Sequence, residues 1–264
     1  MRPTRLPQRP TFRRKTLVRL CQLALISCGA LGAPHILAAD ITWTGAGGTT
    51  NWSEGANWLG GVAPTATDVA VFDSPVVIQP TSDISRQIDL LRFDPGATAT
   101  MLVNVNDYLS LESGITNGSA VTQILAVTPG TGELRFGAGT VTGDVLITNH
   151  GLAWFDNASS AGSADFINSQ GGTGAVLRFM AFSTGGDAIV NNLTDGIVEF
   201  QDNSNAERLL ITNAATGSLL FADNASAGFA TIDNDGTVRF SNSSTAGGVI
   251  TSSLTGNVEF LDAS

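Results

Sequence analysis

Phenylalanine recurs along the chain at intervals of about 21 residues, and this repeat limits the possible folds more than any other feature of the sequence. The recurring residues are Phe93, Phe136, Phe155, Phe179, Phe200, Phe221, Phe240 and Phe260. The interval after Phe93 is about twice the others, so we divide the stretch from Phe93 to Phe260 into eight units. A unit this short cannot bury an apolar face by itself and has to stack on its neighbours.

A second marker fixes the register of these units. The residue thirteen positions after each phenylalanine is Asn106, Asn149, Asn168, Asn192, Asn213 or Asn234, and it becomes Ser253 only after Phe240. Apolar residues stand four and two positions before the asparagine, as Leu209 and Ile211 do before Asn213. This alternation is typical of a strand with one buried face. Each unit is therefore predicted to hold two strands.

The chain after residue 40 shows no sustained helical period, and turn-forming residues interrupt it every few positions. This pattern excludes helices as a main element and favours an all-β fold. Leucine-rich repeats and calcium-binding β-rolls follow different consensus patterns. The fold that fits is a right-handed parallel β-helix, a solenoid of about 21-residue coils.

Stacking gives both markers a structural role. We expect the phenylalanines to form an internal aromatic ladder and the asparagines to turn the corners of the coils, where the side-chain amide can bond to the next coil. The predicted ladder residues are Phe136, Phe155, Phe179, Phe200, Phe221, Phe240, Asn149, Asn168, Asn192, Asn213 and Asn234.

Residues 1–39 are predicted to be a signal peptide. Basic residues up to Arg19 precede an apolar stretch at 20–31, and the small residues Ala38 and Ala39 follow. This order is typical of secretory leaders. Two alternatives stay open. One is a membrane anchor, although polar residues shorten the apolar stretch, and the other is lipidation at Cys28, whose surroundings resemble a lipobox.

Residues 40–72 are predicted to form an N-terminal β cap, and residues 73–264 the β-helix repeats. Trp43, Trp52 and Trp58 fall in the cap, where we expect them to pack over the core of the first coil. The alternative is that Trp52 and Trp58 contact glycans, because sugars stack on exposed aromatic faces. The sequence stops inside a repeat at Ser264, so we expect a chain truncated at its C-terminal end.

Charge is divided sharply along the chain. Seven of the 13 basic residues precede residue 40, whereas the remainder holds six arginines, no lysine and all 23 acidic residues, a net charge of 6 − 23 = −17. This net negative charge repels nucleic acid, so we exclude nucleic acid as a partner. Both cysteines, Cys21 and Cys28, lie in the leader. This excludes disulfides and thiolate chemistry from the rest of the chain.

Few residues after the leader point to catalysis or metal binding. His150 is the one histidine there and follows a corner asparagine, which favours a solvated turn. The run from Asp233 to Gly236 resembles the start of a calcium loop but lacks the later glutamate. The glycine-rich stretch 169–174 is either a binding loop or a flexible insertion. We therefore predict a protein that is not an enzyme, with no catalytic residue, cofactor or dedicated metal site.

The cap, with its spaced tryptophans, glycines and Pro64, precedes LRFDPGATATMLVNVNDYLSLESGITNGSA and units such as GSLLFADNASAGFATIDNDGTVRFSNSSTAGGVIT. Together these segments resemble the passenger region of bacterial autotransporter proteins. The resemblance implies export across the inner membrane and passage through a C-terminal outer-membrane β-barrel. It also implies display of a β-helical stalk that is often adhesive. The barrel is expected only in a full-length version, since the present sequence ends before one.

The sequence thus predicts a non-catalytic exported module for adhesion or surface display, at the cell surface, in the outer membrane or outside the cell. A truly truncated chain would stay in the periplasm. We expect a host-surface or glycan ligand and no stable oligomer. The alternative is a carbohydrate-binding or carbohydrate-active β-helix protein secreted without an anchor, which would need exposed tryptophans or a cluster of aspartates on one outward face.

Overall fold

The computed structural model describes residues 38–75, 78–169 and 174–262. The predicted leader, apart from Ala38 and Ala39, and most of the glycine-rich stretch 169–174 lie outside these residues. Within them the chain is all-β, with one short 3-10 helix, η1 (Gly55–Asn57). None of the described residues belongs to a helix of the length and apolar character that a membrane span requires.

The strands pair in parallel and form two sheets. The 12-stranded sheet contains β1 (Asp40–Thr42), β2 (Val69–Phe72), β4 (Arg86–Phe93), β6 (Tyr108–Asn117), β8 (Glu133–Phe136), β9 (Thr140–Thr142), β11 (Leu152–Phe155), β13 (Val176–Phe179), β15 (Ile197–Phe200), β17 (Ser218–Phe221), β19 (Thr237–Phe240) and β21 (Asn257–Phe260). The 9-stranded sheet contains β3 (Thr81–Ser82), β5 (Leu102–Val105), β7 (Gln123–Val127), β10 (Val145–Asn149), β12 (Asp165–Asn168), β14 (Ile189–Asn192), β16 (Leu210–Asn213), β18 (Thr231–Asn234) and β20 (Val249–Ser252).

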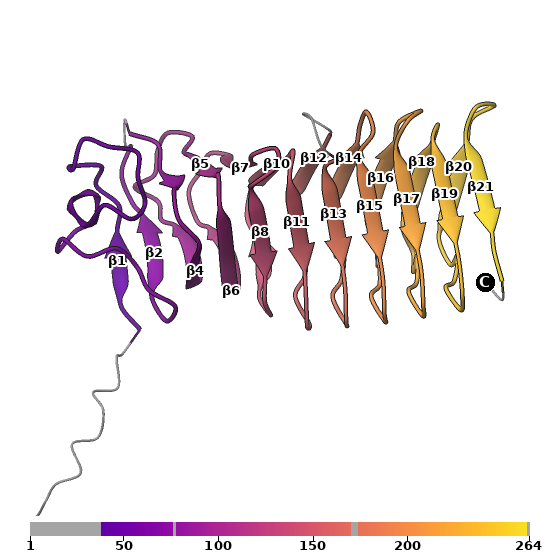
Figure 1. Cartoon of the computed structure of the whole chain (residues 1–264), viewed down its shortest axis with the longest axis horizontal. Coiled ribbons are helices and arrows are strands. Elements are labelled where there is room, and N and C mark those ends of the chain that lie inside the picture. The colour runs from indigo at the N-terminus through magenta and orange to yellow at the C-terminus, as the bar shows by residue number, and fades with distance from the viewer. Residues whose placement is uncertain (1–37, 76–77, 170–173, 263–264) are drawn as a thin grey trace, which may run out of the picture. The chain divides into compact units, whose positions relative to one another are not determined.

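The chain alternates between the two sheets and advances one strand spacing per coil (Figure 1). From β11 to β19, short turns join each strand of the 12-stranded sheet to the next strand of the other sheet. Single bridges between these turns, such as Ser160 to Thr184 and Thr184 to Asn205, make a narrow third side. The described residues from Ala38 onward therefore form the predicted right-handed parallel β-solenoid.

The predicted phenylalanine ladder is confirmed from Phe136 to Phe240. Adjacent rings in this column lie 4.3–4.9 Å apart between centroids, with interplanar angles of 2–10°. Each of these side chains is fully buried. Phe260 continues the stack at 5.1 Å but is 56% exposed, because no further coil of the described residues covers it. Offset ring stacking adds to the burial of each side chain.

The predicted asparagine ladder is confirmed from Asn149 to Asn234. From Asn149 to Asn213, each side-chain Nδ2 donates to the Oδ1 of the asparagine in the next coil, at distances of 2.7–2.8 Å. All five residues are fully buried at the ends of their strands. The column matters because a buried amide without partners costs free energy, whereas a continuous chain of bonds satisfies every member.

Two of the predicted markers lie outside the ladders. Phe93 stacks on Phe72, with centroids 5.2 Å apart, and belongs to a different column from Phe136, which pairs with Leu111. Asn106 is exposed, one residue beyond the buried end of β5. The cause is the ten-residue strand β6, whose pairing with β4 contains a register shift between Ile88 and Leu90. Phe93 therefore does not mark the column of Phe136, and a count of thirteen residues from it ends one position past Val105.

Different residues take the places assigned to those markers. Val105 and Val127 occupy the asparagine column, in register with Asn149. At the other end Ser252, and not Ser253, pairs with Asn234 and accepts from its Nδ2 at 3.3 Å. Valine fits because the column is buried, and serine retains an oxygen that the amide can reach.

Candidate functional site

The three tryptophans of the N-terminal segment form a packed cluster over Phe72. The Trp58 ring lies 5.0 Å from Trp43 and 4.8 Å from Trp52 between centroids, in edge-to-face contacts. Trp52 is 1% exposed and Trp58 is 2% exposed, and Trp58 Nε1 donates to the Trp52 carbonyl at 2.8 Å. Sugar stacking needs an open aromatic face. The alternative that Trp52 and Trp58 contact glycans is therefore corrected: both residues pack in the core.

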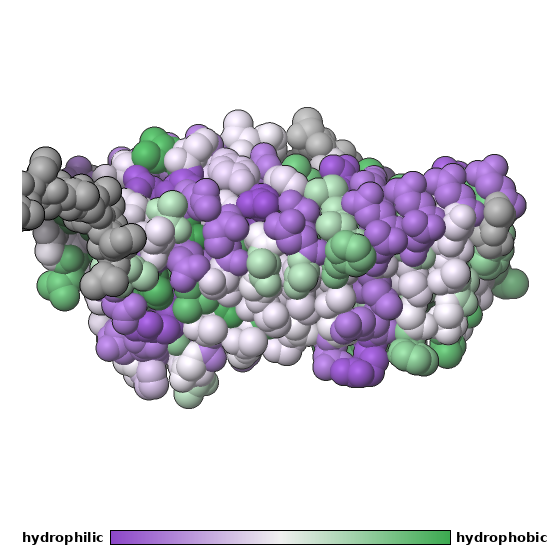
Figure 2. Space-filling model, turned by 90° about the horizontal axis from the view of Figure 1, so that it is seen from below, coloured by the Kyte–Doolittle hydropathy of each residue, from purple (hydrophilic) through white to green (hydrophobic). Residues whose placement is uncertain are grey.

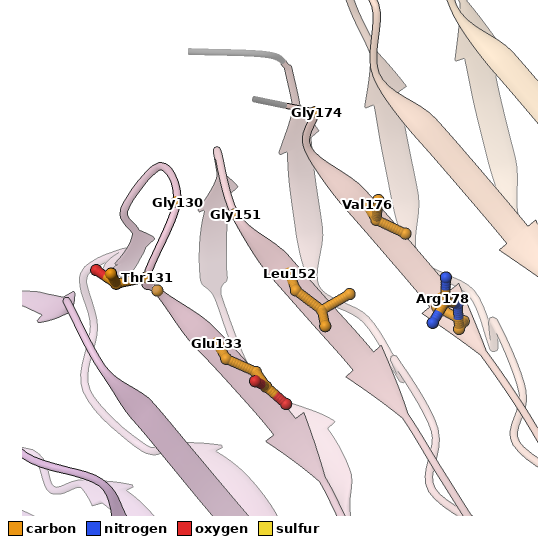
Figure 3. A pocket seen from close by; sticks show the side chains of 9 residues that line it. Gly130, Thr131, Glu133, Gly151, Leu152, Gly174, Val176 and Arg178 are labelled. Carbon is orange, nitrogen blue, oxygen red and sulfur yellow. The ribbon is translucent and has the colours of Figure 1, made fainter. Parts of the chain in front are cut away.

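A groove of about 300 Å³ lies instead on the outer side of the 12-stranded sheet, at the corner where β8, β11 and β13 begin (Figure 3). Its lining combines glycine backbone with a few larger side chains. The lining residues are Gly130, Thr131, Gly132, Glu133, Gly151, Leu152, Gly174, Val176 and Arg178.

The floor of the groove follows from the strand register. Glu133, Leu152 and Val176 are the first residues of three neighbouring strands and pair in sequence with one another. Because side chains alternate along a strand, all three point away from the core. Figure 3 shows them in a row on successive strands. The groove thus offers a carboxylate followed by two aliphatic side chains.

The glycines of the rim allow the coils to approach closely. A Cβ built on Gly151 would lie 2.4 Å from the Gly132 carbonyl oxygen, and one built on Gly132 would lie 2.5 Å from the Val105 carbonyl oxygen of the preceding coil. Neither approach is possible for a residue with a side chain unless the backbone moves. Backbone atoms therefore form part of the lining, with amide and carbonyl groups near the surface.

The arginines around the groove are paired with acids. Arg178 Nε donates to Glu199 Oε2 at 2.6 Å. Arg135, next to the groove on β8, contacts Glu112 at 3.0 Å and Asp156 at 3.1 Å and lies 5.4 Å from the Trp154 ring centre. Burial lowers the pKa of Arg135, but these two acids together with Tyr108 outweigh burial and raise it. These ion pairs fix the positions of the charged side chains on the outer face of the 12-stranded sheet.

His150 lies at the corner between β10 and β11, as predicted. Its Nδ1 is 2.8 Å from the Ser169 carbonyl oxygen and 3.3 Å from Ser169 Oγ. The ring is half-buried and links two neighbouring coils. The prediction of a solvated turn residue is correct for its place in the fold, and the contact with Ser169 adds a structural role.

The segment from Asp233 to Gly236 is a coil corner. Asn234 belongs to the buried asparagine column, whereas Asp233 faces outward. A Cβ on Gly236 would lie 2.3 Å from the Gly217 carbonyl oxygen, so this glycine serves the stacking of coils. In the described part of the chain, no group of three or more His, Cys, Asp and Glu residues is placed to hold a metal ion.

The sequence interpretation missed the groove of β8, β11 and β13. The available signal was the set of corner glycines at 130, 132, 151 and 174, which recur before successive strands. No protein-family model, curated protein or solved structure matches the chain. Function has to be argued from the solenoid and its surfaces.

Proposed function

We propose that this chain is a non-catalytic exported module, a β-helical stalk of the autotransporter passenger type that serves adhesion or surface display. The observation that carries the proposal is the in-register ladder that runs through successive coils. From Phe136 to Phe240 every coil repeats the same buried ring contact. Each further copy of a short sequence unit lengthens the surface by one coil. Such an extended surface suits a stalk better than an enclosed active site.

The outer surface supports the same proposal. Figure 2 shows hydrophilic side chains interspersed with small separate groups of hydrophobic ones over the face seen from below. Single apolar side chains such as Phe182, 67% exposed, and Phe229, 82% exposed, stand on the turns of this solenoid. A mixed surface with isolated aromatic contacts offers many weak attachment points along its length. The partner we propose is a host surface or its glycans.

Export is the first part of the proposal to test. The full chain, with its own leader, is produced in a Gram-negative host, and the cytoplasmic, periplasmic and outer fractions are separated. We expect the protein outside the cytoplasm. The variant Leu25→Arg, which places a charge in the apolar stretch of the leader, is expected to remain inside. Retention of both proteins in the cytoplasm would contradict the proposal.

A carbohydrate-binding function is the second candidate, and the groove of β8, β11 and β13 favours it. Its half-buried aliphatic floor, its carboxylate and its backbone rim form the kind of shallow surface that a sugar ring can cover. Binding of the purified protein to immobilised glycans would test it. Leu152→Asp should abolish such binding. Leu220→Asp, on the outer face of β17, should leave it unchanged.

A further inference from the structure

Asp68 is the one acidic side chain among the described residues that is buried, with 4% of its surface exposed. Its Oδ2 accepts from the Thr65 backbone nitrogen at 2.8 Å and from Thr65 Oγ1 at 2.6 Å, and its Oδ1 accepts from the Ala39 backbone nitrogen at 3.0 Å. None of the ion pairs in the described part of the chain includes Asp68. A buried carboxylate is thus held by neutral donors alone.

The strand register fixes Ala39 against this carboxylate. The Val69 nitrogen donates to the Ala39 carbonyl oxygen at 2.9 Å, and the Trp43 nitrogen donates to Val71 at 2.9 Å. In parallel pairs alternate residues bond to the neighbouring strand. The Asp40 N–H therefore faces away from β2, and β1 is the edge strand of its sheet. Of the backbone nitrogens of Ala39 and Asp40, only that of Ala39 faces Asp68.

We propose that the leader is cleaved between Ala38 and Ala39, so that the mature chain begins with Ala39 and its new ammonium group pairs with Asp68. The reaction is hydrolysis. Water adds to the Ala38 carbonyl carbon, the C–N bond breaks, Ala38 leaves as a carboxylate, and the Ala39 nitrogen is protonated. The cell that exports the chain supplies the peptidase. The inference rests on the proposed export, and it moves the mature N-terminus one residue upstream of Asp40.

In the folded chain, an N-terminus at Ala39 is stabilised by contacts that an N-terminus at Asp40 lacks. Ala38 and Ala39 are both small enough to precede a cleavage site, so residue size does not separate the two positions. An ammonium at Ala39 turns a neutral hydrogen bond to a buried carboxylate into a charge-assisted one. Cleavage after Ala39 would remove that bond and also the acceptor of the Val69 nitrogen. The new charge would then sit on a nitrogen that faces away from β2.

The first test is the N-terminal sequence and intact mass of the exported full chain. We expect a single species that begins at Ala39. A processed chain that begins at Asp40, or at any other residue, overturns this inference and leaves the proposed export intact. A chain that keeps its whole leader overturns both.

The second test uses the absence of lysine after Lys15, which leaves the mature chain with one amine. At neutral pH, an amine-acetylating reagent should modify the exported wild-type chain about tenfold more slowly than the Asp68→Asn variant. A tenfold difference is the change that a rise of one unit in the pKa of the Ala39 amine produces. The exposed-site control Asp233→Asn should react like wild type. Equal rates in all three proteins would overturn the pairing.

Acetylation itself gives a measurement that does not depend on the variant. It removes the positive charge at Ala39, so the melting temperature of wild type should fall. If Asp68→Asn folds, acetylation should leave its melting temperature unchanged. If that variant fails to fold, the wild-type comparison decides alone, and an unchanged melting temperature after complete acetylation overturns the inference.

Discussion

At the scale of single residues, two buried columns hold the coils in register. The aromatic column contributes apolar burial and ring stacking, and the amide column contributes bonds that run from coil to coil. The first column would tolerate a slip of one whole coil, because every ring resembles the next. The amide column would tolerate the same slip, but it resists a shift of one residue along a strand, which would take each amide out of the buried column and away from its partner.

Replacing Phe221 with Ala should lower the free energy of unfolding by about 3 to 5 kcal/mol, because it opens a cavity between two rings. Phe221 is fully buried, with Phe200 and Phe240 4.9 and 4.8 Å away between centroids. Denaturant titration measures the effect. Phe229→Ala is the matched control. It removes an exposed ring and should change stability by about 0.5 kcal/mol or less. Similar values for the two variants would refute the internal ladder.

Asn192→Ala should destabilise the protein by about 1 to 3 kcal/mol, because it leaves two buried partners unsatisfied. Asn168 Nδ2 donates to Asn192 Oδ1 at 2.8 Å, and Asn192 Nδ2 donates to Asn213 Oδ1 at 2.7 Å. The neighbour Asn191 lies outside the buried column, so Asn191→Ala serves as the control with little expected effect. Chemical unfolding of both variants tests this, and a larger loss in the control would contradict it.

At the scale of elements, the corners decide how closely the coils can stack. Gly196 follows Asn192 at the end of β14, and a Cβ there would lie 2.4 Å from Asn192 Oδ1 and 2.6 Å from the Asn168 carbonyl oxygen. Gly196→Ala should therefore cost about 1 to 3 kcal/mol through overpacking. Gly118 has only an ordinary contact at 3.5 Å, so Gly118→Ala should be close to neutral. Thermal melting of the two variants distinguishes a required glycine from an incidental one.

Strand β12 carries an acid that opposes folding at neutral pH. Asp165 is exposed at the start of β12, but partial desolvation of its carboxyl group and the charge of Asp144 raise its pKa above the ordinary value. Asp165 is therefore ionised more readily in the unfolded chain than in the folded one. The resulting loss of stability is complete at pH values above the pKa of the folded state. It disappears as the pH falls below the unfolded value of about 3.9. Asp165→Asn should be more stable than wild type at pH 7, and the difference should vanish near pH 3. An unfolding series across pH measures this.

Asp68 should show the opposite dependence. Burial raises its pKa, but the hydrogen bonds from Thr65 and Ala39 outweigh burial, so the pKa lies below its ordinary value. Its contribution to stability is present above the unfolded pKa and is lost as the pH falls through the folded one. Asp68→Asn should therefore be less stable than wild type at pH 7, and the gap should narrow in acid. A gap that widens in acid would contradict the assignment.

At the scale of the whole molecule, the sequence repeat predicts the later coils better than the early ones. From Phe136 onward each coil places the same residue types in the same columns, so spacing alone locates the rings and amides. Before β8 the register shift at Ile88 and Leu90 breaks that spacing. Val105 and Val127 then occupy the amide column as ordinary aliphatic residues, which carry no distinct marker.

The surface was less predictable for a related reason. The burial of Trp52 and Trp58 depends on contacts with Trp43 and Phe72 that spacing does not show. The groove depends on three corners that come together only when successive coils stack. Composition identifies what residues are available, whereas exposure is a property of the assembled solenoid.

The most direct test of the solenoid measures a distance between coils. Thr148 and Thr251 lie on outward positions of β10 and β20 and are connected by five register steps. The chain has no cysteine after Cys28, so two spin labels can be placed at Thr148→Cys and Thr251→Cys in the exported protein. Electron double resonance should give a narrow distribution near the backbone separation of about 24 Å. A broad distribution, or one centred far from this value, would contradict the stacked coils on which the account rests.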